Sequence, residues 1–263
     1  MRREADAVTM IPVSTDRLMR SLGWAARAGL DNLLPPRCPL CRRYSLDTGL
    51  CAACWRGLVL INDPMCDRCG RPLAYAGPSD LCAACLTTPP PLELIRALAV
   101  YNDISRQLLL QFKHGDGLHI TPLLVRLMSP LLAGMASKHM LVVPIPLHRA
   151  RYLKRRYNQA GELARALIRA TPHGVDDGPI FAPNIITRPR PGRSQAGLSL
   201  HQRIRNLAGA FQVPPVEHAR LAGRPILLID DVMTTGATLY AAARCLSRAG
   251  SGPVRAMVVA RVM

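Results

Sequence analysis

Residues 226–239 read ILLIDDVMTTGATL, and this stretch decides the fold prediction. Its first four residues form an apolar run without alternation, which is typical of a strand buried on both faces of a parallel sheet. Two aspartates follow at once, and a turn of small and hydroxyl residues leads into a helical pattern over 237–249. A strand, a turn and a helix in this order predict an α/β unit with its ligand site at the carboxyl end of the strand.

The same stretch combines negative charge with the features of an anion site. Backbone N–H groups at the start of a helix bind anions, and the helix dipole strengthens this preference. Carboxylates accept hydrogen bonds from sugar hydroxyls. The pattern therefore favours a ligand that has a phosphate at one end and vicinal hydroxyls at the other, such as a ribose 5-phosphate. The predicted binding residues are Asp230, Asp231, Thr234, Thr235, Gly236, Ala237 and Thr238.

Outward from this stretch, apolar runs alternate with helical patterns. Strands are predicted at 96–102, 141–146, 225–229 and 254–262, and helices at 104–114, 157–170, 200–208 and 237–249. A polar stretch with two prolines at 188–198 predicts a loop. These segments predict a parallel sheet covered by helices on both faces, within a domain at 90–263.

Eight of the nine cysteines lie in four CxxC pairs within a segment predicted to be a separate domain, 35–89. Two such pairs supply the four thiolates of a tetrahedral zinc site, so four pairs predict two structural zinc ions. Short intervals favour sequential pairing, although interleaved pairing stays open. The alternatives are disulfides, a thioredoxin-like redox centre and an iron–sulfur site. The predicted ligands are Cys38, Cys41, Cys51, Cys54, Cys66, Cys69, Cys82 and Cys85, whereas Cys245 is predicted to be a buried small hydrophobe.

Composition and charge narrow the class of protein. The 263 residues include 34 Lys and Arg against 17 Asp and Glu, a net charge of +17 that favours acidic partners such as nucleotides or nucleic acid. No run of 18 or more apolar residues predicts a membrane span. The leader at 1–34 contains an amphipathic helix pattern over 15–34 and lacks the apolar core of a secretory signal, so a cytoplasmic location is expected.

Residues 227–238 resemble the 5-phosphoribosyl 1-pyrophosphate (PRPP) signature of type I phosphoribosyltransferases. Three further segments extend the likeness: LLPPRCPLC at 33–41, VPIPLHRARYLKRRYNQA at 143–160 and ITRPRPGRSQAGLSLHQRIRNLAGAF at 186–211. Together they resemble the ComF family of double-zinc-ribbon, phosphoribosyltransferase-like proteins. The resemblance covers the chain from about residue 20 and implies a type I phosphoribosyltransferase domain, Rossmann-like, behind a double zinc ribbon.

The resemblance also implies roles for individual residues. It places a loop near the pyrophosphate, a basic segment after it and a flexible loop that closes over the site. In chain order, these positions are Pro144, Ile145, Pro146, Arg151, Arg155, Asn158, Gln159, Arg188, Ser194, Gln195, Arg203 and Asn206. Asp230, Asp231, Arg188 and Gln195 are the implied catalytic residues. Lys113 matches a family position at the rim of the site, and a solvated helix end explains it equally well.

Two positions depart from the family pattern. Arg156 stands where a glycine is usual, which bears on the local backbone path. Ser194 replaces a threonine, which is a conservative change.

The resemblance implies that the protein binds PRPP with Mg²⁺ or another ribose 5-phosphate ligand, and as a glycosyltransferase (pentosyltransferase) transfers phosphoribosyl to an unidentified acceptor. One alternative is a competence accessory protein that binds single-stranded DNA during natural transformation, for which the basic charge is suited although aromatic residues are only 4% of the chain. Another is a nucleotide sensor without turnover.

Overall fold

The computed structural model describes residues 36–45, 49–77, 79–113, 117–148, 157–171, 178–189, 207 and 209–263. The chain divides into two compact units, Met1–Cys51 and Ala52–Met263. The predicted amphipathic helix at 15–34 lies outside the described residues, as does the helix predicted at 200–208 apart from Leu207. The proposed domain boundaries near 34 and 89 stay predictions.

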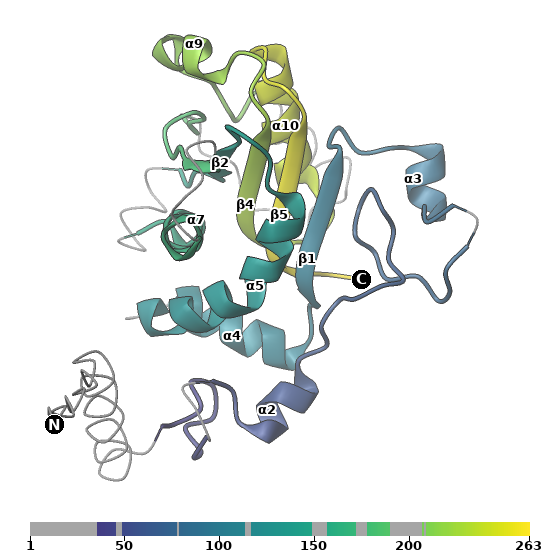
Figure 1. Ribbon diagram of the computed structural model, residues 1–263, viewed down its shortest axis with the longest axis vertical. Helices are drawn as coiled ribbons and strands as arrows, with labels where there is room; N and C mark the ends of the chain where they lie inside the picture. Colours follow the sequence, from purple (N-terminus) through teal and green to yellow (C-terminus); the bar gives the residue numbers. More distant parts are fainter. Residues whose placement is uncertain are drawn as a thin grey trace, which may run out of the picture. The chain divides into compact units, whose positions relative to one another are not determined.

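The larger unit is built on a five-stranded sheet in which every neighbouring pair is parallel (Figure 1). The strand order is β1-β5-β4-β2-β3. The strands are β1 Leu94–Val100, β2 Leu141–Pro144, β3 Ile180–Phe181, β4 Ile226–Met233 and β5 Val254–Arg261. The predicted parallel α/β fold is therefore confirmed, and the four predicted strands are all present. The sequence did not predict β3, because two residues give no periodic pattern.

Helices connect and cover the strands. The described α-helices are α2 Ala52–Gly57, α3 Ala83–Thr87, α4 Asp103–Lys113, α5 Thr121–Met135, α7 Gln159–Ala170, α9 His218–Leu221 and α10 Ala237–Arg248. Two short 3₁₀ helices are η1 Gly117–Ile120 and η2 Pro215–Glu217. The helices predicted at 104–114, 157–170 and 237–249 are confirmed within two residues at each end. The sequence analysis did not predict α5.

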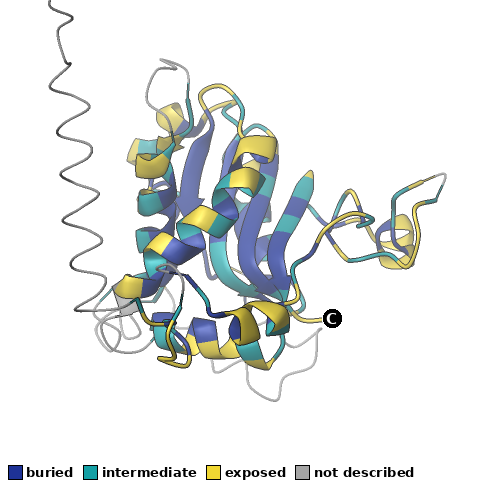
Figure 2. Ribbon diagram, turned by 60° about the horizontal axis from the view of Figure 1, so that its bottom comes forward, coloured by how far each residue is buried: buried dark blue, intermediate teal, exposed yellow. Residues whose placement is uncertain are grey.

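Both faces of the sheet are buried. Leu239, Ala242 and Leu246 of α10 pack on alternate strand residues such as Val143 and Leu228. The intervening strand residues are also fully buried, and α5 and α7 lie on that other face (Figure 1). Figure 2 shows buried strands flanked by helices that expose their outer sides. Burial on both faces explains the continuous apolar runs in the sequence.

The outer edge of β1 is paired rather than free. Ile61 donates its N–H to Leu98 O at 3.0 Å, and Val100 donates to Val59 O at 2.9 Å. Nearer the start of the strand, Ile95 donates to Arg68 O at 2.8 Å. An exposed edge would offer unpaired backbone groups to other chains, and the segment around the second pair of CxxC motifs covers it.

Candidate functional site

The two adjacent aspartates lie within β4, not after it. The strand continues four residues past the predicted end at 229, because β5 supplies parallel partners: Asp230 is opposite Val258 and Val232 is opposite Ala260. Asp230 and Asp231 are partly buried, whereas the four residues before them are fully buried. The sheet thus presents both carboxyl groups at its carboxyl end, where ligands of open α/β sheets bind.

The two carboxyl groups differ in their surroundings. Asp231 donates its N–H to Asp230 Oδ1 at 2.9 Å, and Lys113 Nζ lies 2.6 Å from Asp231 Oδ2. Burial raises the pKa of Asp230 to about 7, and the negative charge of Asp231 adds to the rise. The Asp231 N–H and the positive charges of Lys113 and Arg188 oppose it. Near neutral pH, Asp230 is therefore poised to lose a proton when further positive charge arrives.

The turn after β4 begins helix α10 through a left-handed glycine. Gly236 has φ +78°, and a Cβ atom there would lie 2.6 Å from Tyr240 Cζ and 2.9 Å from Met233 Cε. A residue with a side chain would meet both obstacles, so only glycine fits this turn. The turn and Asp230 line one small hollow of about 20 Å³. The sequence-predicted residues brought together there are Asp230, Thr234, Thr235, Gly236, Ala237 and Thr238.

The predicted pyrophosphate loop lies beside the same strand end. Pro144 is opposite Ile229, and Ile145 donates its N–H to Ile229 O at 2.9 Å. Asn158 Nδ2 donates to Ile145 O at 3.1 Å, so the first residues of the 157–160 segment hold this loop. The structure therefore brings residues 144–146 next to the strand end that carries the aspartates, whereas their role at a pyrophosphate stays a prediction.

Two side chains of the YNQ segment hold the end of α4. Tyr157 donates its hydroxyl to Phe112 O at 2.9 Å, and Gln159 Nε2 donates to Lys113 O at 3.4 Å. These bonds fix the backbone from which Lys113 reaches Asp231. Apart from the family likeness at Lys113, no local pattern predicts this pairing, because more than 100 residues separate the two charges and only the fold brings them together.

Arg188 contributes a buried positive charge. Its residue is 9% exposed, and its guanidinium lies 5.5 Å from the centre of the Phe211 ring. Its charge also acts on the carboxyl of Asp230. The contact with Phe211 was not predicted from the sequence. Other predicted residues lie outside the described part of the chain: Arg151, Arg155, Arg156, Ser194, Gln195, Arg203 and Asn206.

The eight paired cysteines form two clusters in sequential order. The first cluster is Cys38, Cys41, Cys51 and Cys54, and the second is Cys66, Cys69, Cys82 and Cys85. Within each cluster the sulfur atoms lie within 4.8 Å of one another, and all eight thiols are free rather than joined in disulfides. Sequential pairing is thus confirmed over interleaving.

The chemistry of both clusters fits zinc. Burial disfavours a thiolate, but backbone N–H groups of Cys41, Cys51 and Leu40 outweigh it and lower the pKa of Cys38 to about 6. The same competition lowers the pKa of Cys66 to about 7, with N–H groups from Cys69, Cys82 and Arg68. Four sulfurs this close, with backbone donors that favour the thiolate at Cys38 and at Cys66, are the ligand set of a structural zinc ion. A complete four-thiolate shell leaves no position for substrate.

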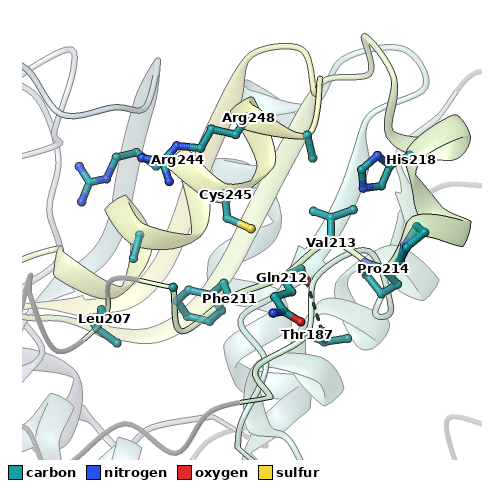
Figure 3. A pocket seen from close by; sticks show the side chains of 14 residues that line it. Thr187, Leu207, Phe211, Gln212, Val213, Pro214, His218, Arg244, Cys245 and Arg248 are labelled. Atoms are coloured by element: carbon teal, nitrogen blue, oxygen red, sulfur yellow. Dashed lines mark hydrogen bonds between the residues drawn. The ribbon is translucent and has the colours of Figure 1, made fainter.

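A second hollow of about 930 Å³ lies beside α10 (Figure 3). None of the residues from Asp230 to Thr238 line it. Its wall is largely apolar, and Figure 3 shows Arg244 and Arg248 on one side of Cys245 with His218 on the other. Because its basic groups do not converge, this hollow lacks the chemistry of the β4 site.

Residues 29–86 match the family model of a double zinc ribbon domain. The chain is 32% identical over 238 residues to the DNA utilization protein YhgH of Salmonella typhimurium, covering 88% of this chain and 99% of that one. It is 30% identical over 232 residues to competence protein F of Haemophilus influenzae, covering 86% and 96%. Competence protein ComFC of Bacillus subtilis is 31% identical over 208 residues, covering 78% and 80%.

Among solved structures, a hypoxanthine phosphoribosyltransferase from Staphylococcus aureus aligns with a TM-score of 0.29 at 14% identity, covering 54% of this chain and 61% of that one. A phosphoribosylpyrophosphate synthetase from Mycobacterium smegmatis aligns with a TM-score of 0.28 at 18% identity, covering 54% and 33%.

Among the described helices, none has the length and apolar character needed to cross a bilayer.

Proposed function

The chain belongs to the ComF family, and on that basis we propose that its larger unit binds PRPP with Mg²⁺, or another ribose 5-phosphate ligand. One observation supports this most strongly. The two carboxyl groups of β4 and the helix-initiating turn at 234–238 lie at the same sheet edge, and Asp230 lines the turn's hollow. A ligand with a phosphate and vicinal hydroxyls matches both halves of this arrangement.

In this proposal the turn binds the 5-phosphate through backbone N–H groups and threonine hydroxyls. Asp230 and Asp231 accept hydrogen bonds from the ribose hydroxyls. Oxygen ligands are those that Mg²⁺ prefers, and the ammonium of Lys113 already sits 2.6 Å from Asp231, so these carboxylates suit a cation. When bound, Mg²⁺ would screen the charge of the pyrophosphate.

The leaving pyrophosphate gains negative charge during phosphoribosyl transfer. Arg188 is suited to offset it, because the residue is buried and its charge already acts on Asp230. Residues 144–146 would position the pyrophosphate, and Arg151, Arg155 and Gln195 would complete the enclosure. The acceptor, a nitrogen nucleophile in phosphoribosyltransferases, is not identified by any described residue. Closure of the flexible loop that the family resemblance implies would exclude water and suppress hydrolysis of PRPP.

Calorimetry with PRPP and Mg²⁺ tests the binding proposal. Asp230→Asn combined with Asp231→Asn should lower affinity by about 100-fold, because two charge-assisted hydrogen-bond acceptors are lost. Glu93→Gln is the matched control. Glu93 forms an ion pair with Arg255, with 2.8 Å between Oε2 and Nε, and this pair does not involve the carboxyl end of β4. Unchanged affinity in the double variant would overturn the proposal.

The pKa of Asp230 predicts how binding depends on pH. Bound cation and sugar hydroxyls favour the carboxylate, whereas the free protein holds the proton up to about pH 7. Protons therefore compete with the ligand below that pH, and affinity should rise from pH 6 to pH 8. The Asp230→Asn variant should lack this rise. A wild-type affinity that is flat over this range would contradict the assignment of Asp230.

A second function rests on the relatives. They are named competence and DNA utilization proteins, and this chain has a net charge of +17. It would then bind single-stranded DNA in a DNA-uptake pathway. Anisotropy titrations with an oligonucleotide should show affinity that falls steeply between 50 and 200 mM salt, on the order of tenfold or more. Binding no tighter than that of a protein of matched charge would count against this function.

A pyrophosphate-release assay separates transfer from sensing. The wild-type chain is mixed with PRPP, Mg²⁺ and a panel of bases and amines. Release that depends on one acceptor supports a pentosyltransferase. Tight PRPP binding without release from any acceptor would instead favour the nucleotide-sensor alternative.

A further inference from the structure

The second cysteine cluster is attached to the sheet that carries the ligand site. Besides the bond from Ile95 to Arg68 O, the Arg96 guanidinium donates to Asp67 O at 2.8 Å and to Cys66 O at 3.4 Å. Gly70 lies so close to β1 that a Cβ atom at this position would be 2.5 Å from Ile95 O. The cluster and β1 therefore form one packed body.

Arg261 connects the second cluster to the end of β5. Its Nη1 donates to Cys69 O, and its Nε is buried without a hydrogen-bond partner among the described residues. The four thiols beside it are all buried. Four thiolates and one Zn²⁺ carry a net charge of about −2, and a neighbouring guanidinium would offset it. Zinc binding deprotonates the four thiols and thus places negative charge beside the partly buried guanidinium.

Tyr240 extends this connection to the phosphate turn. It lies one helical turn after Gly236, and its ring fills the space where a Gly236 side chain would project. Burial raises the pKa of the Tyr240 hydroxyl, the charge of Arg261 opposes the rise, and Cys69, Cys85 and Cys82 add to it. Arg261 is also opposite Met233 in the sheet, and the Met233 side chain reaches the turn, because its Cε would lie 2.9 Å from a Cβ atom at Gly236. Backbone pairing adds a second link, because Val262 donates to Met233 O at 2.9 Å.

We propose that the second cysteine cluster, when loaded with zinc, braces the turn at 234–238, with Arg261 and Tyr240 as the positioning residues. Zinc fixes the Cys66–Cys69 knuckle, whose Cys69 carbonyl accepts a hydrogen bond from Arg261. Arg261 in turn holds its sheet partner Met233 at the start of the turn, and the Tyr240 ring packs beside Gly236. The consequence for ligand affinity rests on the proposed function, whereas the consequence for the order of the turn does not.

Hydrogen exchange of the full-length, zinc-loaded protein tests the brace. Arg261→Met should raise exchange of the 234–240 amides by about tenfold, since local opening of the turn becomes easier. Tyr240→Ala should do the same, and Tyr240→Phe should restore slow exchange because the ring remains. Arg37→Met is the matched control, because Arg37 is an exposed arginine next to the first cluster. It should leave the 234–240 amides unchanged.

Zinc release to a chelator gives a second measurement that general destabilisation of the turn would not move. Arg261→Met should release one of two zinc ions about tenfold faster, because a favourable charge near the thiolates is lost. Arg261→Lys should recover part of this loss. Unchanged exchange at 234–240 together with unchanged zinc release in Arg261→Met would overturn the proposal.

The two proposals fail in different ways. If the wild-type chain does not bind PRPP, the proposed function fails, and exchange at 234–240 still decides whether the brace exists. If the wild type binds PRPP and the Tyr240→Ala variant binds it equally well with slow exchange, the brace is wrong and the proposed function stands.

Discussion

The two cysteine knuckles have the same local structure but different surroundings. Cys38 donates its N–H to Arg43 O at 2.7 Å, and Cys66 donates to Arg71 O at the same distance. An antiparallel bridge closes each knuckle, between Arg37 and Tyr44 in the first and between Met65 and Pro72 in the second. The chain thus builds one motif twice.

The two knuckles differ at the residue that follows the first CxxC pair of each cluster. Both positions are left-handed, with φ +59° at Arg42 and +65° at Gly70. The first knuckle tolerates an arginine there, at a modest conformational cost. The second requires glycine, because the Ile95 carbonyl occupies the space of a side chain. Identical CxxC spacing therefore predicts a metal knuckle in both places, and the second knuckle also packs against β1.

The largest expected effect comes from removing one ligand of each cluster. Cys66→Ser should lower the free energy of unfolding by about 3–5 kcal/mol or prevent folding, because zinc binding and packing on β1 are lost together. Cys38→Ser should lower the melting temperature of the larger unit clearly less than Cys66→Ser does. Calorimetric melting and zinc content measure both. Equal losses in the two variants would erase the distinction between the knuckles.

Substitution at the left-handed positions should give the next effect. Gly70→Ala should destabilise by about 2–4 kcal/mol, since it combines a positive φ with a steric clash. The reciprocal change, Arg42→Gly, removes an unfavourable conformation and should stay within about 1 kcal/mol of wild type. Urea unfolding distinguishes them. A small effect of Gly70→Ala would show that the second knuckle can move away from β1.

Substitutions of two arginines next to the knuckles should differ less in their effect on the free energy of unfolding. Arg96→Met removes two hydrogen bonds to carbonyls of the second knuckle and should cost about 1–2 kcal/mol. Arg37→Met removes one exposed bond of 3.3 Å and should cost under about 0.5 kcal/mol. The urea midpoints of the two variants measure the difference, and a reversed order would contradict the attachment to β1.

The ninth cysteine should give the smallest effect. Cys245 lies in α10 and is partly buried rather than fully buried as the sequence predicts, and burial raises the pKa of its thiol. Cys245→Ala should leave zinc content unchanged and alter stability by about 1 kcal/mol or less. Metal analysis of the purified variant checks this. Loss of zinc would show that Cys245 also serves as a ligand.

Much of the fold was predictable because its signals are local. Apolar runs such as 226–229 identify strands buried on both faces, and the CxxC repeats identify metal knuckles. Short or irregular elements escaped, including β3 with its two residues. The proximity of the aspartates to the turn at 234–238 was predictable, since they are contiguous in sequence. Their extension of β4 was not, because it depends on pairing with β5.

The sequence by itself determined the α/β class, the four CxxC pairs and the strand-turn-helix unit at 226–248, because each depends on residue type and spacing within a short segment. Tertiary structure alone decided which charges meet. It paired Lys113 with Asp231, placed Arg188 on Phe211, and brought Arg261 to the second cluster. These contacts join segments far apart in the chain, and the energies that select them come from burial and packing of the whole sheet, which no local pattern records.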